Sequence, residues 1–179
     1  ISDFMNITPD KQRMDSLMVA ANIRNLSLLE LFYTCVSNLC KIMNERGTKI
    51  PDEQHHYIEK DDYNKCIYHK RDMDATERTI VVMKDADILI KICDSTGDFD
   101  DTSEYQLLIR LLKEHTIIDD DGSRRLRQKE EVENPSEVLL NPSDPEATFR
   151  YKAGGKHLGY VGNIVESVGE NGSLIIDYD

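Results

Sequence analysis

The stretch SLLELFYTCVSNLCKIMNE, residues 27–45, decides most of the fold. Its apolar residues recur at spacings of three and four, which is the period of one helix face. Ser27 and Glu30 form a capping-box pattern, in which each side chain satisfies a backbone N–H at the start of a helix. The stretch therefore predicts an amphipathic helix that ends before Gly47. We expect its polar side to face solvent: Glu30, Thr34, Ser37, Lys41 and Glu45.

Two further helices are predicted on the C-terminal side of this one. Asp74 and Glu77 repeat the capping-box pattern before an apolar stripe that runs to Asp94. Asp101 and Glu104 open a third helix, which carries four leucines between residues 107 and 112. The polar, tyrosine-bearing stretch from 48 to 73 has weak periodicity. It predicts a short helix near 53–62 and a loop.

The character of the sequence changes after the helices. Residues 119–137 are charged and rich in breakers, which predicts a loop, and NPSDP at 141–145 is typical of a linker. Residues 158–168 alternate and are rich in β-branched side chains, GENG follows as a turn signal, and SLIIDYD resumes the strand pattern. This end of the chain predicts a β-hairpin. Near the other end, the apolar run at 17–21 fits either a strand or a helix start.

Composition restricts the class of protein. The net charge is −12, from 22 Lys and Arg residues against 34 Asp and Glu residues, which argues against a chain that coats nucleic acid. The sequence has neither a run of eighteen apolar residues nor a visible signal peptide. None of its four cysteines lies in a CxxC pair, so we expect reduced core thiols rather than a zinc site. We therefore expect a cytoplasmic protein with no membrane contact.

Few residues indicate chemistry by spacing alone. Asp15 lies beside the short apolar run, and a carboxylate there could bind a divalent cation or cap a helix. The acidic loops do not keep the calcium-loop register, and the histidines, including His55, His56 and His69, lack metal-ligand spacing. A small basic cluster surrounds Gly154 and Gly155, where its members could contact phosphates or discourage strand pairing at a sheet edge. The cluster consists of Arg150, Lys152, Lys156 and His157.

Two segments together resemble a known family. QRMDSLMVAANIRNLSLLELFY, from residue 12, resembles the strand that carries the first catalytic aspartate in bacterial insertion-sequence transposases of the DDE class. NPSDPEATFRYKAGGKHLGYVGNIVESVGENGSLIIDYD, residues 141–179, resembles the next part of that family. The shared pattern is an Asp-x-x-Ala-x-x-Arg segment, a Lys-x-Gly-Gly-Lys segment, a Gly-Tyr strand, a turn and an apolar return strand. The resemblance covers about a third of the chain.

The resemblance implies a metal-dependent DNA enzyme. Such transposases cut DNA at element ends and join the 3′-OH to target DNA, with two Mg²⁺ (or Mn²⁺) ions held by two aspartates and a glutamate. Asp15 corresponds to the first aspartate, so it is the expected catalytic residue and metal ligand. Lys152 and Lys156 are expected near the DNA path beside the metal, together with Arg150 and His157. The class also allows a homo-oligomer on DNA.

The family's second aspartate and its glutamate would lie beyond residue 179, so we expect this chain to be a piece of a longer protein, with no metal bound and no activity alone. We expect an α+β, helix-dominated fold with an incomplete ribonuclease H-like antiparallel sheet. Residues 1–25 are the first-strand region, 26–140 a helical insertion, and 141–179 the second and third strands.

Three alternatives remain. One is a non-catalytic helical module for protein interaction or regulation, in which Asp15 caps a helix and binds no metal. Another is an unrelated ribonuclease H-like nuclease, which requires further carboxylates beside Asp15 within this chain. The third is a regulatory remnant of a decayed transposase, which the sequence alone does not distinguish from a truncated one.

Overall fold

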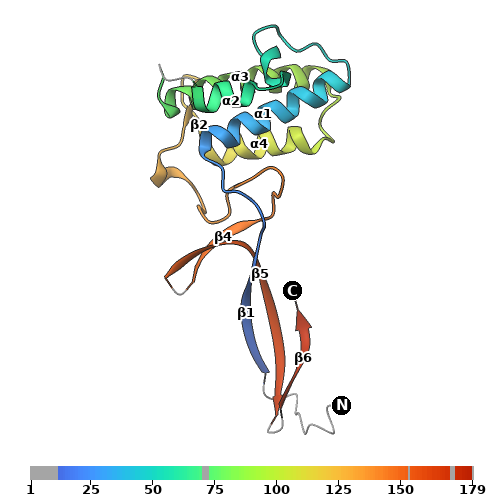
Figure 1. Ribbon diagram of the computed structural model, residues 1–179, viewed down its shortest axis with the longest axis vertical. Helices are drawn as coiled ribbons and strands as arrows, with labels where there is room; N and C mark the ends of the chain where they lie inside the picture. The colour runs from blue at the N-terminus through green and yellow to red at the C-terminus, as the bar shows by residue number, and fades with distance from the viewer. Residues whose placement is uncertain (1–11, 70–72, 153, 170–171, 179) are drawn as a thin grey trace. The chain divides into compact units, whose positions relative to one another are not determined.

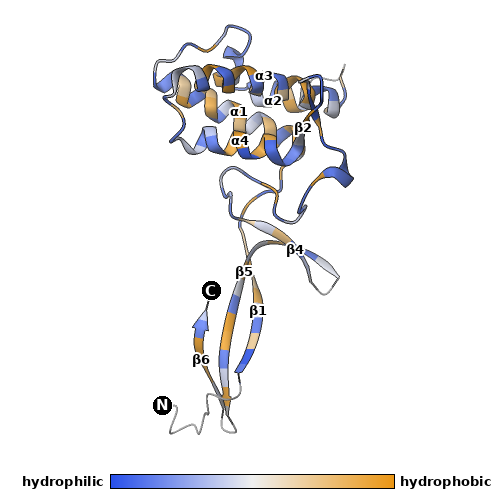
Figure 2. Cartoon of the chain, turned by 180° about the vertical axis from the view of Figure 1, so that it is seen from behind, coloured by the Kyte–Doolittle hydropathy of each residue, from blue (hydrophilic) through white to orange (hydrophobic). Residues whose placement is uncertain are grey.

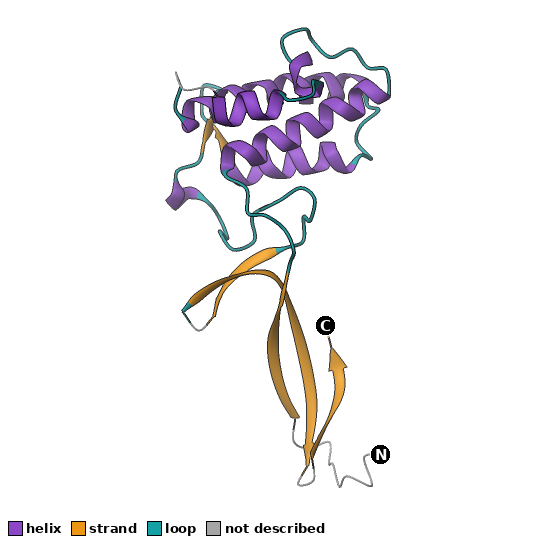
Figure 3. Cartoon of the chain, in the orientation of Figure 1, coloured by secondary structure: helices purple, strands orange, loops and turns teal. Residues whose placement is uncertain are grey.

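A computed structural model describes residues 12–69, 73–152, 154–169 and 172–178. The fold is α+β, as predicted, with helices and antiparallel sheets (Figure 3). The chain divides into two compact units. The helical unit comprises residues 23–145, and the sheet unit combines residues 1–22 with 146–179. The unit boundaries thus fall at 22/23 and 145/146, where the sequence placed them at 25/26 and 140/141.

α1 (Leu28–Glu45) is the central helix of the helical unit. It begins where the sequence predicts, because Ser27 accepts from the backbone N–H of Glu30 and Glu30 accepts from the backbone N–H of Ser27. These bonds satisfy two donors that a helix start leaves unpaired. α1 packs against both α3 (Ala75–Thr96) and α4 (Ser103–His115). It is therefore a core helix rather than a surface helix.

The predicted solvent side of α1 is wrong for Glu30 and Ser37, which are both buried. Residues 54–69, where the sequence predicted a short helix near 53–62 and a loop, form short helical turns instead and pack over this side of the helix. The hydroxyl of Ser37 donates to the carbonyl of Tyr57 at 2.8 Å, and the hydroxyl of Tyr63 donates to the carboxylate of Glu30 at 3.0 Å. The segment contains a 3₁₀ turn, an α-helical turn and a π-helical turn: η1 (His55–Ile58), α2 (Asp62–Asn64) and η2 (Lys65–His69).

The caps of the other two helices follow the sequence closely. The second capping box, between Asp74 and Glu77, is confirmed, and α3 ends at Gly97 with a φ of 69°. Glycine suits this left-handed end because it has no Cβ to clash with the backbone. The third helix begins later than predicted, since its N-cap is Thr102 and not Asp101.

The loop predicted for 119–137 is wrong in part. The segment around it folds into a two-stranded antiparallel hairpin and a 3₁₀ turn: β2 (Thr116–Ile118), β3 (Arg124–Leu126) and η3 (Lys129–Glu131). Arg125 organises the region, because its guanidinium pairs with Asp119 at 3.1 Å and with Glu131 at 2.8 Å. A strand of three residues is too short to show alternation of apolar and polar residues. The many charged residues of the segment therefore predicted a loop instead.

The hydrophobic core of the described residues lies wholly within the helical unit, between Leu29 and Leu139. Cys35, Cys40 and Cys93 are buried in it as free thiols. Its largest fully buried side chains come from all three long helices and the connections beside them: Phe32, Leu39, Met43, Met83, Leu89, Phe99, Leu108, Leu111 and Leu139. None of the helices that the structure describes is long and apolar enough to span a membrane.

Hydrogen bonds tie the two ends of the helical unit together. The side-chain amide of Asn141 donates to the carbonyl of Arg24 at 3.0 Å. Arg110, on α4, donates to the carbonyl of Glu137 at 2.9 Å and to that of Pro145 at 2.8 Å. The segment that leaves the unit is thus fastened beside the segment that enters it.

The sheet unit is built around β5 (Gly155–Gly169). β1 (Gln12–Ala20), which the sequence left open between strand and helix, pairs antiparallel with β5 along its whole length. β6 (Gly172–Tyr178) pairs antiparallel with the other edge of β5, so the predicted C-terminal hairpin is confirmed (Figure 1). β4 (Thr148–Lys152), which the sequence did not separate from the linker, pairs antiparallel with the start of β5.

Apolar side chains are exposed on both faces of the sheet. Because alternate residues of a strand point to opposite faces, Leu17 and Val19 lie on one face of β1 and Met14 lies on the other. Their exposed fractions are 42%, 48% and 70%. Figure 2 shows the corresponding alternation of hydrophobic and hydrophilic segments along the strands. Apolar residues on both faces are typical of a sheet that is covered on both sides.

Candidate functional site

Asp15 lies within β1 and caps no helix. Its cross-strand partner on β5 is Ile164, which in turn lies opposite Tyr178 on β6. The carboxylate is exposed, and its Oδ1 accepts a hydrogen bond from the backbone N–H of Ser16 at 2.9 Å. One carboxylate oxygen thus stays fixed near the backbone while the side chain remains open to a ligand.

A second carboxylate lies on the same face of the sheet. Glu166 is directly opposite Arg13, and their side chains pair at 2.9 Å. Since Arg13 and Asp15 are two residues apart on β1, Glu166 is a diagonal neighbour of Asp15. Among the described residues, however, Asp15 belongs to no group of three His, Cys, Asp or Glu side chains close enough to hold a metal ion.

The basic cluster lies at the other end of β5, in the β4–β5 hairpin. Arg150 is directly opposite His157, so these two side chains lie on one face. Lys156 lies on the opposite face, with its Nζ 4.2 Å from the centre of the Phe149 ring. The backbone of Lys152 pairs in β4, but its side chain is outside the described residues. The structure therefore divides the predicted basic cluster between two faces.

The basic residues and Asp15 are separated along β5. His157 and the cross-strand partner of Asp15, Ile164, are seven positions apart on this strand. At a rise of about 3.3 Å per residue, this corresponds to roughly 23 Å. The sequence placed the basic residues beside Asp15. In the structure the hairpin that carries them pairs further along β5 than Asp15 does.

A different group of candidate ligands comes together in the helical unit. Single ligand atoms of His56, Asp62 and Cys66 all lie within 4.8 Å of one another. The carboxylate oxygen Oδ2 of Asp62 is 2.8 Å from Nδ1 of His56 and 3.5 Å from Sγ of Cys66. The hydroxyl of Tyr33, on α1, donates to the same oxygen at 2.6 Å. The sequence did not indicate this group, because its spacing matches no metal-binding motif.

The electrostatics of this cluster centre on Asp62, which is only 6% exposed. Burial alone opposes ionisation of its carboxyl group, but hydrogen bonds from Tyr33, His56 and Cys66 outweigh burial and lower its pKa. The pKa of Tyr33 is raised well above its usual value by burial and by the hydrogen bond to Asp62. Asp62 is therefore a carboxylate held by a phenol that keeps its proton.

Comparison of the chain with protein-family models, with curated proteins and with solved structures gives no significant match.

Proposed function

We propose that this chain is part of the catalytic core of a DDE-class transposase, an enzyme of metal-dependent DNA cleavage and strand transfer. In this proposal the sheet unit supplies the first three strands of a ribonuclease H-like core: β1, β5 and β6. The helical unit is an insertion between the first and second of these strands. The sequence resemblance supplies the class of reaction.

The observation that carries the proposal is the position of Asp15 in an antiparallel meander. β1 pairs with β5, and β5 pairs with β6, in the order that the resemblance requires. Asp15 is in the middle part of β1, and its carboxylate is exposed. This placement supports a transposase over the helical interaction module, because that module requires Asp15 to cap a helix.

The two apolar faces of the sheet give further support. Met14 on one face and Leu17 on the other are exposed, although apolar side chains on both faces are typical of a buried sheet. A ribonuclease H-like core buries such a sheet between layers of helices. The proposal thus explains why both faces of the sheet carry apolar side chains, which a β-meander exposed to solvent on both faces would not have.

The proposed metal ions are Mg²⁺ or Mn²⁺, for which oxygen atoms are the preferred ligands. The carboxylate of Asp15 fits this preference and would hold one such ion. When bound, such ions activate the attacking oxygen and stabilise the leaving oxygen. The remaining carboxylates of the set are those that the resemblance places beyond residue 179.

DNA is the proposed partner, and the β4–β5 hairpin is the proposed phosphate contact. Arg150 and His157 share one face of the hairpin, roughly 23 Å along β5 from the row of Asp15. Because His157 and Ile164 are an odd number of positions apart, this is the face opposite to that of Asp15, whereas Lys156 lies on the same face as Asp15. That length corresponds to about seven base-pair steps at ~3.4 Å each. Contacts of this kind position DNA and do not read its sequence.

The test is a strand-cleavage and joining assay on the longer protein that continues this sequence through the two later carboxylates. The substrate is a duplex with the ends of the DNA element that encodes it, in Mg²⁺ or Mn²⁺. We expect Asp15→Asn to lower the rate by at least about 100-fold, the scale of losing one electrostatic stabiliser of a transition state. Folding is checked by circular dichroism.

The matched control is Asp177→Asn. Asp177 is also an exposed strand carboxylate, but it lies on β6 opposite Val165, which faces the other side of the sheet from Asp15. We expect its replacement to leave the rate unchanged. Equal rates for Asp15→Asn and the wild type would refute the assignment of Asp15, and a longer protein without any activity would favour the interaction module.

A further inference from the structure

The cluster of His56, Asp62 and Cys66 has the donor set of a transition-metal site. An imidazole nitrogen, a carboxylate oxygen and a thiol sulfur lie within 4.8 Å of one another. We propose that these three side chains bind a Zn²⁺ ion, in a site of the helical unit that is separate from Asp15 and its function. The proposal stands or falls independently of the transposase assignment, because it needs no residue of the sheet unit.

The chemistry of the donors selects zinc over the hard cations. Zn²⁺ accepts thiolate, imidazole and carboxylate ligands together, whereas Mg²⁺ and Ca²⁺ require oxygen ligands. The charges also balance, since the carboxylate of Asp62 and the thiolate of Cys66 neutralise a dication. Asp62 is buried and Cys66 is half-buried, so this neutrality limits the cost of placing the ion there.

Two of the three ligand distances are close to those around zinc, and the third, between His56 and Cys66, is within 4.8 Å and must shorten by up to about 1.2 Å. Bond lengths of about 2.0 to 2.3 Å around tetrahedral zinc place ligand atoms roughly 3.4 to 3.6 Å apart. The carboxylate oxygen of Asp62 is already 3.5 Å from the sulfur of Cys66. Its distance to Nδ1 of His56 is 2.8 Å, so these two groups must separate by about 0.6 Å to admit the ion.

The local backbone brings together three ligands from an eleven-residue segment, His56 to Cys66. Asp61 has a φ of 73°, and this left-handed residue turns the chain into the helical turn that begins at Asp62. The π-helical turn η2 then carries Cys66 four residues after Asp62. π-Helical turns are uncommon and occur frequently at functional sites.

Tyr33 holds the same carboxylate oxygen of Asp62 from α1. Its hydroxyl donates to Asp62 at 2.6 Å, and both side chains are buried. Hydrogen bonds of this kind orient metal ligands and sustain their affinity. The ion would take the place of the hydrogen bonds that His56 and Cys66 now make to Asp62, while the hydrogen bond from Tyr33 to Asp62 would remain.

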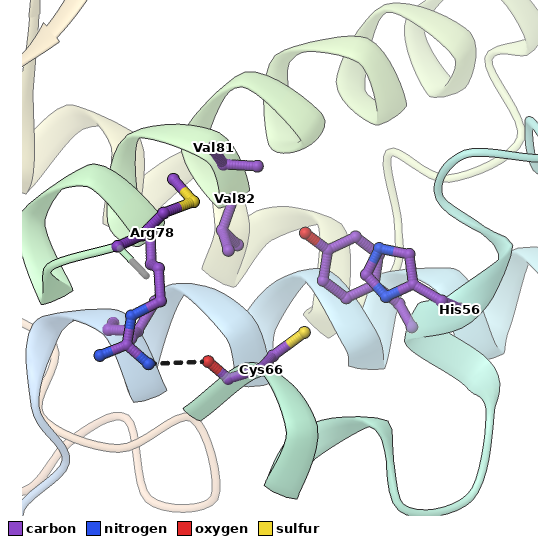
Figure 4. Close-up of a pocket in the computed structure, with 8 residues that line it drawn as sticks. His56, Cys66, Arg78, Val81 and Val82 are labelled. Atoms are coloured by element: carbon purple, nitrogen blue, oxygen red, sulfur yellow. Dashed lines mark hydrogen bonds between the residues drawn. The ribbon is translucent and has the colours of Figure 1, made fainter. Parts of the chain in front are cut away.

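A cavity next to the cluster has room for a fourth ligand. The cavity has a volume of about 50 Å³, which exceeds the space that one water molecule needs. His56 and Cys66 line one part of it, and Val81 and Val82 of α3 line another (Figure 4). Figure 4 shows the sulfur of Cys66 and the ring of His56 directed toward the same space. A water molecule there would complete a tetrahedral set.

Binding is a ligand exchange without oxidation or reduction. The thiol of Cys66 loses its proton to solvent as the sulfur–zinc bond forms, and His56 binds as a neutral imidazole through Nδ1. The carboxylate of Asp62 binds in its ionised form. The proton that the Cys66 thiol gives up is therefore released for each ion bound.

The first experiment titrates the full chain with Co²⁺ alone, which reports thiolate ligation through an intense charge-transfer absorption. We expect one Co²⁺ per chain, displacement by Zn²⁺, and loss of the charge-transfer band in Cys66→Ser. His56→Gln should weaken binding by at least about tenfold, and Tyr33→Phe by roughly tenfold through loss of the supporting hydrogen bond. His55→Gln is the matched control, because His55 is adjacent but exposed and outside the cluster. Circular dichroism confirms the fold of each variant.

A second experiment uses alkylation of Cys66 in the unmodified chain. Cys35, Cys40 and Cys93 are buried, and burial raises the pKa of these thiols to about 12, 12 and 11. Alkylation of the folded chain by iodoacetamide therefore reports mainly on Cys66, and we expect Zn²⁺ to slow it at least about tenfold. Equal alkylation with and without Zn²⁺ would overturn the proposal. Co²⁺ binding that is as tight in His56→Gln as in His55→Gln would also overturn it.

Discussion

Gly159 of β5 lies in close contact with the backbone of Val19 on β1, since a β-carbon added at Gly159 would be 2.0 Å from the carbonyl oxygen of Val19. Gly159 also has a φ of 148° and is the position at which β5 pairs with both Ala20 of β1 and Thr148 of β4. A residue without a side chain is therefore needed where the two pairings meet.

We expect Gly159→Ala to weaken the pairing of β1 with β5. Removing the overlap requires backbone movement that costs about 1–3 kcal/mol, in addition to the strain of the positive φ. Hydrogen exchange of the β1 amides, measured by NMR, should rise accordingly. Gly154→Ala is the control, because Gly154 also has a positive φ (80°) but nothing lies within 4 Å of the added carbon. Equal exchange in the two variants would show that the close approach to Val19 does not matter.

Leu39 is the second position with a clear expectation, because it is fully buried in the middle of α1. Leu39→Ala should lower the free energy of unfolding by about 2–5 kcal/mol through lost burial and a residual cavity. Ile88→Ala, on the same kind of helix but 40% exposed, should change it by less than about 1 kcal/mol. Urea unfolding followed by circular dichroism measures both values. Similar losses in the two variants would contradict the position of the core.

The ion pair between Arg125 and Glu131 makes a prediction about pH. Bidentate hydrogen bonds from Arg125, followed by the backbone N–H of Gln128, lower the pKa of Glu131 from 4.5 to about 2. Because the folded-state pKa is the lower one, the pair stabilises the fold above pH 4.5, and this contribution is lost as the pH falls toward 2. The contribution is modest, since the side chains of Arg125 and Glu131 are 40% and 34% exposed and solvent screens the pair.

An NMR titration of the Glu131 carboxyl carbon tests this directly. We expect a midpoint near 2 in the wild type and a midpoint closer to 4.5 in Arg125→Gln. Lys129→Gln removes a charge from the same turn without removing a hydrogen bond to Glu131, so it should leave the midpoint near 2. A wild-type midpoint at 4.5 would mean that the pair does not persist in solution.

The DNA contact proposed for Arg150 predicts a change in salt dependence. A phosphate contact releases about one counterion, so Arg150→Gln should weaken DNA binding for all sequences and reduce the slope of log K against log salt by about 1. Lys84→Gln, an exposed cation on α3, should leave the slope unchanged. Fluorescence anisotropy with a short duplex at several salt concentrations measures the slope. An unchanged slope for Arg150→Gln would remove Arg150 from the DNA path.

The elements predicted from the sequence are those with strong local signals. The start of α1 at Ser27 and the β5–β6 hairpin follow from capping and alternation, which are properties of neighbouring residues. The burial of Ser37 does not follow from its own helix, because it depends on residues 54–69 packing over it. β4 was missed because five residues beside a proline-rich segment carry too little alternation.

The candidate sites differ in the same way. Asp15 was selected through resemblance, and the short apolar run beside it left strand and helix open, because the strand forms only through pairing with the distant β5. The cluster of His56, Asp62 and Cys66 depends on a left-handed residue and a π-helical turn, neither of which has a sequence signature. Its ligands become neighbours only when the segment folds onto α1.

The bond between Asn141 and Arg24 also has a consequence for the order of folding. Arg13 and Glu166 pair across a sequence separation of 153 residues, and closing so long a loop in an unfolded chain is entropically costly. Once the helical unit has folded, the 3.0 Å hydrogen bond from Asn141 to the carbonyl of Arg24 joins its two ends. The loop that remains to be closed then consists only of the residues between this bond and the Arg13–Glu166 pair. By the logarithmic dependence of closure entropy on length, this lowers the cost by roughly 1 kcal/mol. We therefore expect the helices to form first and the β1–β5 pairing to follow as the slow step. The folded helical unit speeds this step because it shortens the loop that the pairing must close.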